Sequence, residues 1–346
     1  TSVHWHGIRQ LLTNEEDGAN GVTQCPIAPG QHLTYEWTAT QYGTSWYHSH
    51  FSLQYSEGLA GPIVINGPTT ANYDEDLGPV MLTDWYHNTA FSLWHIAEAG
   101  GPPPADNGLI NGHNVFDCST SNSTACVGGG KRYQFPEFKA GKKYLLRLIN
   151  SSTDTHFHVS LDGHSMTVVS ADFVPIKPYT AQYVSIGIGQ RYDVIIEANA
   201  AASSYWFRAA IQTTCSAVNP QAGNVLGIVR YSGVKSTADP TTNGTSVVDH
   251  CNDEPLTSLI PYVPLSVKKE TFNNVTDISI GLVFQNTFKW TLNGISGNIE
   301  WNSPTLLKLI NNQPFPTDYH VLNLPDVATF VIESALGITH PLHLHG

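Results

Sequence analysis

Residues 183–198 read YVSIGIGQRYDVIIEA and contain two short runs rich in Val, Ile and Tyr, YVSIGIG and YDVIIEA. Such runs favour β-strands, and Gly, Pro and Asn residues between them mark turns. Four further runs share this composition: GPIVING (61–67), PVMLTDW (79–85), KYLLRLIN (143–150) and NVLGIVRY (224–231). Many short strands separated by turn signals are typical of β-sandwiches or barrels and not of a parallel α/β sheet. The sequence therefore predicts an all-β protein.

The length of 346 residues suits two or three domains of ordinary size. Helical periodicity is scarce, and the best candidate is a short helix over residues 90–100, AFSLWHIAEAG. Two polar, turn-rich stretches near 67–75 and 235–262 are candidate domain boundaries. We accordingly expect domains over residues 1–68, 69–250 and 251–346.

The composition narrows the class of partner and the compartment. A net charge of −12 argues against binding to nucleic acids or to anionic membrane surfaces. No run of eighteen apolar residues predicts a transmembrane helix, and the first residues show no signal-peptide pattern. Few Lys and Arg, many Ser, Thr and Asn, and four glycosylation sequons indicate a secreted glycoprotein. The sequons begin at Asn122, Asn150, Asn243 and Asn274.

Five cysteines are present, and four of them form plausible pairs. Cys118 and Cys126 bracket a short Ser/Thr-rich stretch, and Cys215 and Cys251 bracket a longer polar segment. Both pairs predict disulfides in an oxidising compartment. Cys25 is then left over, either as a buried free thiol or with a partner outside this sequence.

Histidines are concentrated in three His-x-His pairs. On a strand, residues i and i+2 point to the same face about 6.6 Å apart, so each pair can bind one metal ion or two neighbouring ions. Three convergent pairs supply more imidazoles than one four-coordinate zinc needs, which favours a multinuclear site with nitrogen ligands. The pairs are His4 and His6, His48 and His50, and His343 and His345, the last preceded by His340. An isolated fourth pair, His156 and His158, we interpret as structural.

The histidine motifs carry a family resemblance. HWHG (4–7), WYHSH (46–50) and HPLHLHG (340–346) resemble, in this order, the first three copper-binding motifs of multicopper oxidases. The segments DGANGVTQCPIAPGQ (17–31) and IGQRYDV (188–194) are similar to those of fungal laccases of the ascomycete type. The resemblance implies consecutive cupredoxin-like Greek-key β-sandwich domains. Three are expected in the parent protein, with a trinuclear copper cluster between the first and third and a type 1 copper in the third.

By motif position, the resemblance implies that His4 and His343 bind the type 2 copper and that His340 is a type 1 ligand. It assigns four of the six type 3 ligands to His6, His48, His50 and His345. The parent would hold four coppers, none of them in the middle domain. The family's fourth motif, His-Cys-His, is absent from this sequence. We therefore expect that the first and third domains are truncated, that Cys25 pairs with a cysteine of the missing part, and that this chain alone is inactive.

The same resemblance suggests roles for four other residues. Asp17 would assist proton transfer near the cluster, although an Asp before Gly is also common in turns. Asp172 would accept the proton of a phenolic substrate, or would simply end a strand. Phe288 and Trp290 would form walls of the substrate pocket, although aromatic residues of β proteins usually belong to the core.

The predicted function is that of a secreted, monomeric laccase that oxidises phenols and reduces O2 to water. Three alternatives remain at this stage. Another multicopper oxidase, such as an ascorbate oxidase, bilirubin oxidase or ferroxidase, would share the same motifs. A zinc hydrolase would usually show His-x-His-x-Asp-His, which HWHGIR and HSHFSL lack. A non-catalytic glycoprotein that has lost its metals disagrees with the seven intact ligand positions.

Overall fold

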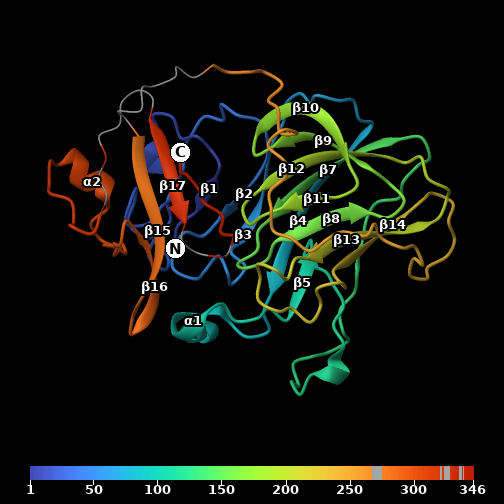
Figure 1. Ribbon diagram of the computed structural model, residues 1–346, viewed down its shortest axis with the longest axis horizontal. Helices are drawn as coiled ribbons and strands as arrows, with labels where there is room; N and C mark the ends of the chain where they lie inside the picture. The colour runs from blue at the N-terminus through green and yellow to red at the C-terminus, as the bar shows by residue number, and fades with distance from the viewer. Residues whose placement is uncertain (267–274, 320–321, 323–327, 335–336, 338) are drawn as a thin grey trace.

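The computed structural model describes the chain apart from residues 267–274, 320–321, 323–327, 335–336 and 338. It confirms the all-β class (Figure 1). The middle of the chain contains β4 (Glu75–Trp85), β5 (Asn107–Ile110), β6 (Tyr133–Gln134), β7 (Lys143–Asn150), β8 (Phe157–Leu161), β9 (Met166–Ala171), β10 (Val174–Ala181), β11 (Val184–Ile186), β12 (Arg191–Glu197), β13 (Ser204–Ile211) and β14 (Leu226–Arg230). The two ends contain β1 (His4–His6), β2 (Gly43–His48), β3 (Ala60–Ile65), β15 (Val275–Gln285), β16 (Thr287–Leu292) and β17 (Thr329–Ser334).

Strands β4–β14 form a two-sheet sandwich, here called the middle sandwich (residues 75–230). One sheet has the order β10-β9-β12-β7-β4-β5 and the other has the order β11-β8-β13-β14-β6. A continuous buried core fills the space between them, with Leu148, Phe207 and Val194 among its fully buried members. This arrangement explains the apolar runs of the sequence, because both sheets turn one face towards a shared interior.

Strands β7 and β12 are buried on both faces, and this positions the first part of the chain. Alternate residues of a strand point to opposite faces. Leu146 and Leu148 of β7 therefore join the sandwich core, whereas Leu145 packs with Ile195 on the other face. On that outer face the strands contact β2, which belongs to a separate antiparallel sheet of order β1-β2-β3, here called the first sheet.

The third sheet, of order β16-β15-β17, lies beyond the first sheet when seen from the middle sandwich (Figure 1). The carbonyl oxygens of Gly21 and Val22 accept hydrogen bonds from the backbone N–H groups of Thr305 and Leu306. These bonds link the loop between β1 and β2 to the C-terminal part of the chain. Thr305 and Leu306 are the first two residues of α2 (Thr305–Ile310), a helix that the sequence did not predict. The predicted helix is present as α1 (Ala90–Gly100). In the described part of the chain, no helix is long and apolar enough to cross a bilayer.

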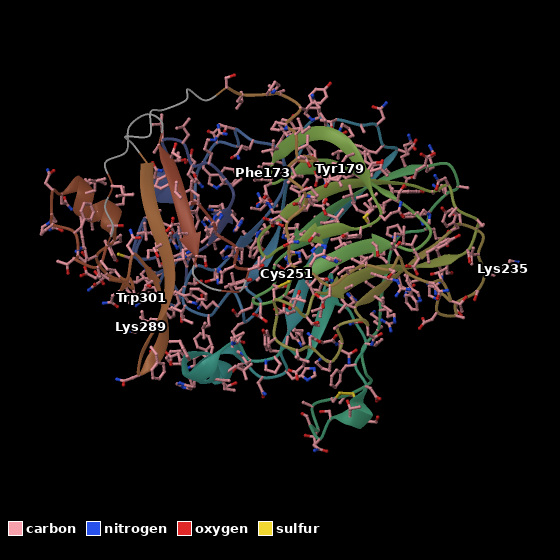
Figure 2. All side chains as sticks on the ribbon, in the orientation of Figure 1. Phe173, Tyr179, Lys235, Cys251, Lys289 and Trp301 are labelled. Atoms are coloured by element: carbon pink, nitrogen blue, oxygen red, sulfur yellow. A yellow bond between two sulfur atoms is a disulfide. The ribbon has the colours of Figure 1, made fainter. Side chains whose placement is uncertain are left out.

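Both predicted disulfides are present. Cys118 and Cys126 have Cα atoms 5.6 Å apart, and Cys215 and Cys251 have Cα atoms 6.0 Å apart. The second bridge holds the segment after residue 250 against the middle sandwich, where Cys251 lies in Figure 2. Cys25 is free, but it is exposed, so the alternative of a buried thiol is wrong.

One predicted glycosylation site conflicts with the fold. Asn150 is fully buried at the end of β7, and its amide donates hydrogen bonds to the carbonyl oxygens of Thr155 and Ile186. A glycan there would displace core structure, so this sequon is a correction to the sequence-based set. Asn122 and Asn243 are exposed, and Asn274 lies outside the described residues.

Candidate metal centre

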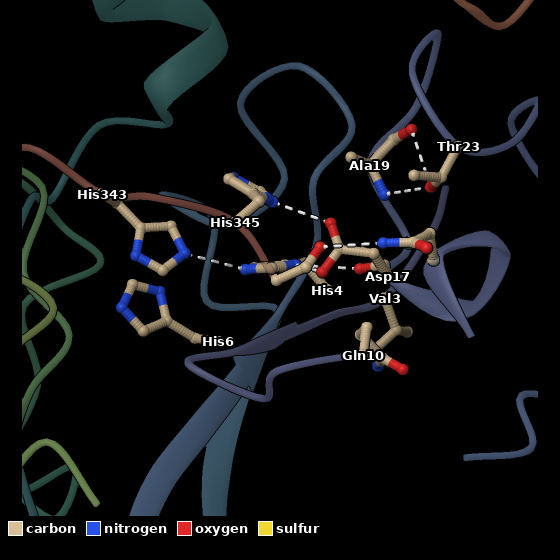
Figure 3. Close-up of polar contacts among 12 residues, drawn as sticks. Val3, His4, His6, Gln10, Asp17, Ala19, Thr23, His343 and His345 are labelled. Carbon is tan, nitrogen blue, oxygen red and sulfur yellow. Dashed lines mark hydrogen bonds and ion pairs between the residues drawn. The ribbon is translucent and has the colours of Figure 1, made fainter. Parts of the chain in front are cut away.

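The three His-x-His pairs, which are far apart in the sequence, meet at one place. Figure 3 shows two of these pairs, His4 with His6 and His343 with His345. Strand β1 presents His4 and His6, and its antiparallel register places His4 opposite His48 of β2. His50 lies two residues after the end of β2. The C-terminal segment then brings His343 and His345 against β1, with ring centroids 3.9 Å from His6 and 4.1 Å from His4, respectively.

His4 is the centre of this group, which we call the histidine cluster (His4, His6, His48, His50, His343 and His345). Its Nε2 atom lies 3.2 Å from Nε2 of His343. On another side, Nδ1 of His6 lies 3.4 Å from Nε2 of His48. The rings of His50 and His345 are 5.1 Å apart. The histidines thus form three close pairs around a common centre.

Hydrogen bonds to the outer nitrogens set the orientation of three rings. We assign the Nδ1 proton of His4 as the donor to the carbonyl oxygen of Asp17, at 2.8 Å. Nδ1 of His345 donates to the carboxylate Oδ2 of Asp17 at 2.8 Å. Nδ1 of His48 donates to the carbonyl oxygen of Ser49 at 3.1 Å. In each case Nε2 keeps its lone pair, which is the arrangement that metal-binding histidines need.

Burial within the cluster lowers the pKa of four of its histidines and so favours their neutral form. Burial, and after it the neighbouring histidines, lowers the pKa to about 3 for His48 and His343 and to about 4 for His50. Burial lowers the pKa of His6 further. Burial alone would raise the pKa of Asp17, but hydrogen bonds from His345 and His4 outweigh it and hold this pKa below its usual range. One buried carboxylate therefore lies beside a group of imidazole nitrogens.

These residues fit a metal site of the kind that the motifs imply. Two nitrogens bound to one ion at about 2 Å lie roughly 3–4 Å apart. The separations of 3.2 and 3.4 Å within the cluster satisfy this condition. Two sets of three possible ligand atoms lie within 4.8 Å of one another, and both include His4: one adds His6 and His48, the other His343 and His345. Imidazole nitrogens in such a shared arrangement suit copper, and one ion cannot use them all.

His340 is placed apart from the cluster. It is exposed, and its ring packs 4.5 Å from that of Trp290. It lines a cavity of about 650 Å³ that also reaches the cluster and Asp172. It lines a second cavity of about 730 Å³ together with Trp290. Phe288 packs against Phe284 with ring centroids 5.1 Å apart and does not line either cavity.

His156 and His158 belong to the middle sandwich and to neither of these two sets of ligand atoms, although His156 also lines the 650 Å³ cavity. His156 is hydrogen-bonded to the hydroxyl of Ser185, and the His158 ring packs 4.5 Å from that of His250. One residue at the site, Arg191, was not predicted from the sequence. It is 4% exposed and lines the 650 Å³ cavity. The segment IGQRYDV contained it, but nothing in the pattern showed which side chain its guanidinium would contact.

Comparisons with known proteins agree with this fold. Residues 1–70 and residues 76–234 each match a family model described as multicopper oxidase. The chain belongs to the multicopper oxidase family.

Several of the similar proteins are named laccases. The chain is 52% identical over 355 residues to Laccase-2 of Botryotinia fuckeliana, covering 100% of this chain and 60% of that protein. It is 45% identical over 368 residues to Laccase-3 of the same fungus, covering 100% of this chain and 78% of that protein. The crystal structure of the laccase from Botrytis aclada matches with a TM-score of 0.95 and 52% identity, covering 100% of this chain and 64% of that one. The chain thus spans about 60% of the length of the first of these relatives.

Proposed function

We propose that the protein carrying this chain is a laccase, which oxidises phenols and reduces O2 to water. The observation that carries the proposal is the convergence of the six imidazoles of the histidine cluster, five of them around His4. The similarity to laccases over the full chain supports the same reaction and favours it over other multicopper oxidases. We also propose the division into three cupredoxin-like domains, secretion as a monomer, and glycosylation at Asn122 and Asn243.

In this proposal, His4 and His343 hold a type 2 copper. His6 with His48, and His50 with His345, supply ligands to two type 3 coppers, and His340 is a ligand of the type 1 copper. When bound, copper supplies one-electron redox chemistry and the four-electron reduction of O2. Four phenols would each lose one electron and one proton, and O2 would take up four electrons and four protons to give two waters.

The protein's own part is to place donors and to move protons. Asp17 accepts hydrogen bonds from His4 and His345, so it is placed to fix these rings and to pass protons towards the cluster. Asp172 lines the 650 Å³ cavity with a side chain that is 48% exposed, so it can accept the proton of a phenol there. His340 lies between this cavity and the one beside Trp290.

The test compares the holoprotein with a His48→Ala variant. The wild type should contain copper and consume O2 when a simple phenol is added. The variant should lose copper from the cluster and should consume little O2, because one paired ligand is missing. His95→Ala is the matched control, since His95 is exposed on α1 and its side chain is 71% accessible. A wild type that binds only zinc, or a His48 variant with unchanged copper and oxygen uptake, would refute the proposal.

A further inference from the structure

Arg191 connects the first sheet with the carboxylate that the proposed laccase uses to receive the phenol's proton. We propose that Arg191 is a positioning residue that holds Asp172 in place relative to the histidine-bearing strands. The inference rests on the proposed function and adds a role for the middle sandwich, which contributes none of the proposed copper ligands. Its basis is a set of contacts that a single buried guanidinium makes in two directions.

On one side, Arg191 contacts the first sheet. Its Nε donates to the carbonyl oxygen of Thr44 in β2 at 3.2 Å. Its Nη2 lies where a side chain at Gly7 would meet it at 2.5 Å, and Gly7 follows His6 directly. A glycine with a φ of +78° is therefore needed at that position both for its backbone and for the close approach of the guanidinium. The guanidinium is thus hydrogen-bonded to the backbone of β2 and lies close to Gly7, the residue after β1.

On the other side, Arg191 holds the turn that presents Asp172. Its backbone N–H donates to Oδ1 of Asp172 at 2.8 Å, and its Nη1 lies 3.0 Å from the same oxygen. The backbone N–H of Asp172 in turn donates to the carbonyl oxygen of Arg191 at 3.0 Å. These contacts occupy one carboxylate oxygen and hold the Asp172 side chain where it lines the cavity.

The turn needs such support. Asp172 and Phe173 are consecutive non-glycine residues with positive φ, 46° and 68°. Left-handed conformations at such residues cost free energy and persist only where the surroundings enforce them. The Phe173 ring packs 5.4 Å from the Arg191 guanidinium carbon and also faces Gly43 of β2. Figure 2 shows Phe173 at the edge of the middle sandwich that faces the first sheet.

Only arginine can make all of these contacts at once. A lysine would keep the positive charge, but one ammonium cannot reach the Thr44 carbonyl and the Asp172 carboxylate in the planar fork geometry of a guanidinium. Arg191→Lys should therefore release the turn while leaving the charge near the cluster. The matched control is Arg208→Lys, because Arg208 also pairs with a carboxylate, Asp162, within the middle sandwich but makes no bond to the first sheet.

The experiment compares two reductants in the copper-loaded full protein: a simple phenol, which must lose a proton, and ferrocyanide, which loses only an electron. For Arg191→Lys we expect kcat/KM for the phenol to fall about tenfold, with kcat/KM for ferrocyanide changed by less than about twofold and copper content unchanged. Arg208→Lys should leave both ratios unchanged. Equal losses with both reductants, or no loss with the phenol, would overturn the inference.

A double-mutant cycle tests the route through Asp172. If Arg191 acts by placing this carboxylate, Arg191→Lys combined with Asp172→Asn should oxidise the phenol as fast as Asp172→Asn alone. Multiplied losses would show independent roles and would count against the inference. Should Arg191→Lys fail to fold, Phe173→Leu loosens the same turn, and it should slow the phenol about threefold and spare ferrocyanide. An inactive wild type would reject the proposed function itself, a result that is distinct from all of these.

Discussion

One residue, Asp17, orients two imidazoles of the cluster that come from opposite ends of the chain. It accepts from His4 through its backbone carbonyl and from His345 through its side chain. Groups of this kind set the ring orientation and basicity of metal ligands, and their loss typically lowers metal affinity or activity about 10–100-fold. Asp17 therefore matters as much for building the site as for the proton transfer proposed for it.

We predict that Asp17→Asn lowers the copper content of the cluster or slows oxygen reduction by about 10–100-fold, because a neutral amide is a weaker acceptor for His345. The measurements are copper per chain and oxygen uptake with a phenol. Asp117→Asn is the control, since Asp117 is an exposed residue that caps a short 3-10 turn. Copper content and oxygen uptake equal to those of the wild type would contradict the role assigned to Asp17.

The middle sandwich contains other buried histidines, and one of them, His158, makes the stability of the fold depend on pH. Burial, and then the neighbouring His250 and His156, lowers the pKa of His158 from 6.5 to about 4. The unfolded chain takes up a proton at this residue below about pH 6.5, whereas the folded chain does so only near pH 4. The stabilisation by neutral His158 is therefore complete above about pH 6.5 and is lost as the pH falls towards 4.

We predict that His158→Phe reduces the loss of stability between pH 7 and pH 5. The measurement is the urea midpoint at the two pH values for the variant, the wild type and the control His95→Phe, whose histidine is exposed on α1. The control should keep the full pH dependence of the wild type. An unchanged pH dependence in His158→Phe would show that other groups govern acid sensitivity.

The residues of the site divide into those that a pattern in the sequence reveals and those that only the fold reveals. The six histidines of the cluster can be recognised from the sequence by their spacing and their neighbours. Arg191 does not, because its importance comes from reaching Thr44, which is 147 positions away in the chain. Similarly, Asn150 satisfies the sequon pattern, but its burial becomes visible only when β7 is placed inside the sandwich.

At the scale of elements, the apolar runs predicted strands well where both ends of the run are marked. KYLLRLIN coincides with β7, and YDVIIEA is displaced by one residue from β12 (Arg191–Glu197). YVSIGIG was less accurate, since only Val184–Ile186 is a strand and the glycines after it form a turn. The order of the strands was not predictable, because β4 pairs in parallel with β7, which lies far along the chain.

We predict that Leu148→Ala destabilises the middle sandwich by about 2–5 kcal/mol, because it removes a fully buried side chain from the centre of β7 and leaves a cavity. Leu256→Ala is the control, since that side chain is 84% exposed, and it should change the unfolding free energy by less than about 0.5 kcal/mol. Urea unfolding of both variants measures the difference. Similar small effects would mean that the core is not packed as described.

At the scale of the molecule, the candidate metal centre forms where separate segments of the chain come together. His4 and His6 come from β1, His48 from β2, and the last pair from the C-terminal segment, so no single sheet holds the cluster. The middle sandwich supplies the support on which the first sheet docks, through Arg191 and through Arg147, whose Nη1 donates to the hydroxyl of Thr44 at 3.1 Å. Local patterns predict each pair, whereas their meeting depends on the whole fold.

The last prediction concerns what a polypeptide limited to these 346 residues can do. A blue type 1 copper needs a cysteine thiolate beside its histidines. Of the five cysteines, four form disulfides, and Cys25 is an exposed residue on a different segment from His340. The chain also lacks the His-Cys-His motif, which the family resemblance implies as the source of the remaining cluster ligands. With copper supplied, this polypeptide should therefore show no intense thiolate-to-copper absorption and no phenol-dependent oxygen uptake, whereas a longer protein that adds such a motif should show both. The visible spectrum and an oxygen electrode measure these properties, and a blue, oxygen-consuming product from residues 1–346 alone would mean that the type 1 site has been assigned to the wrong residues.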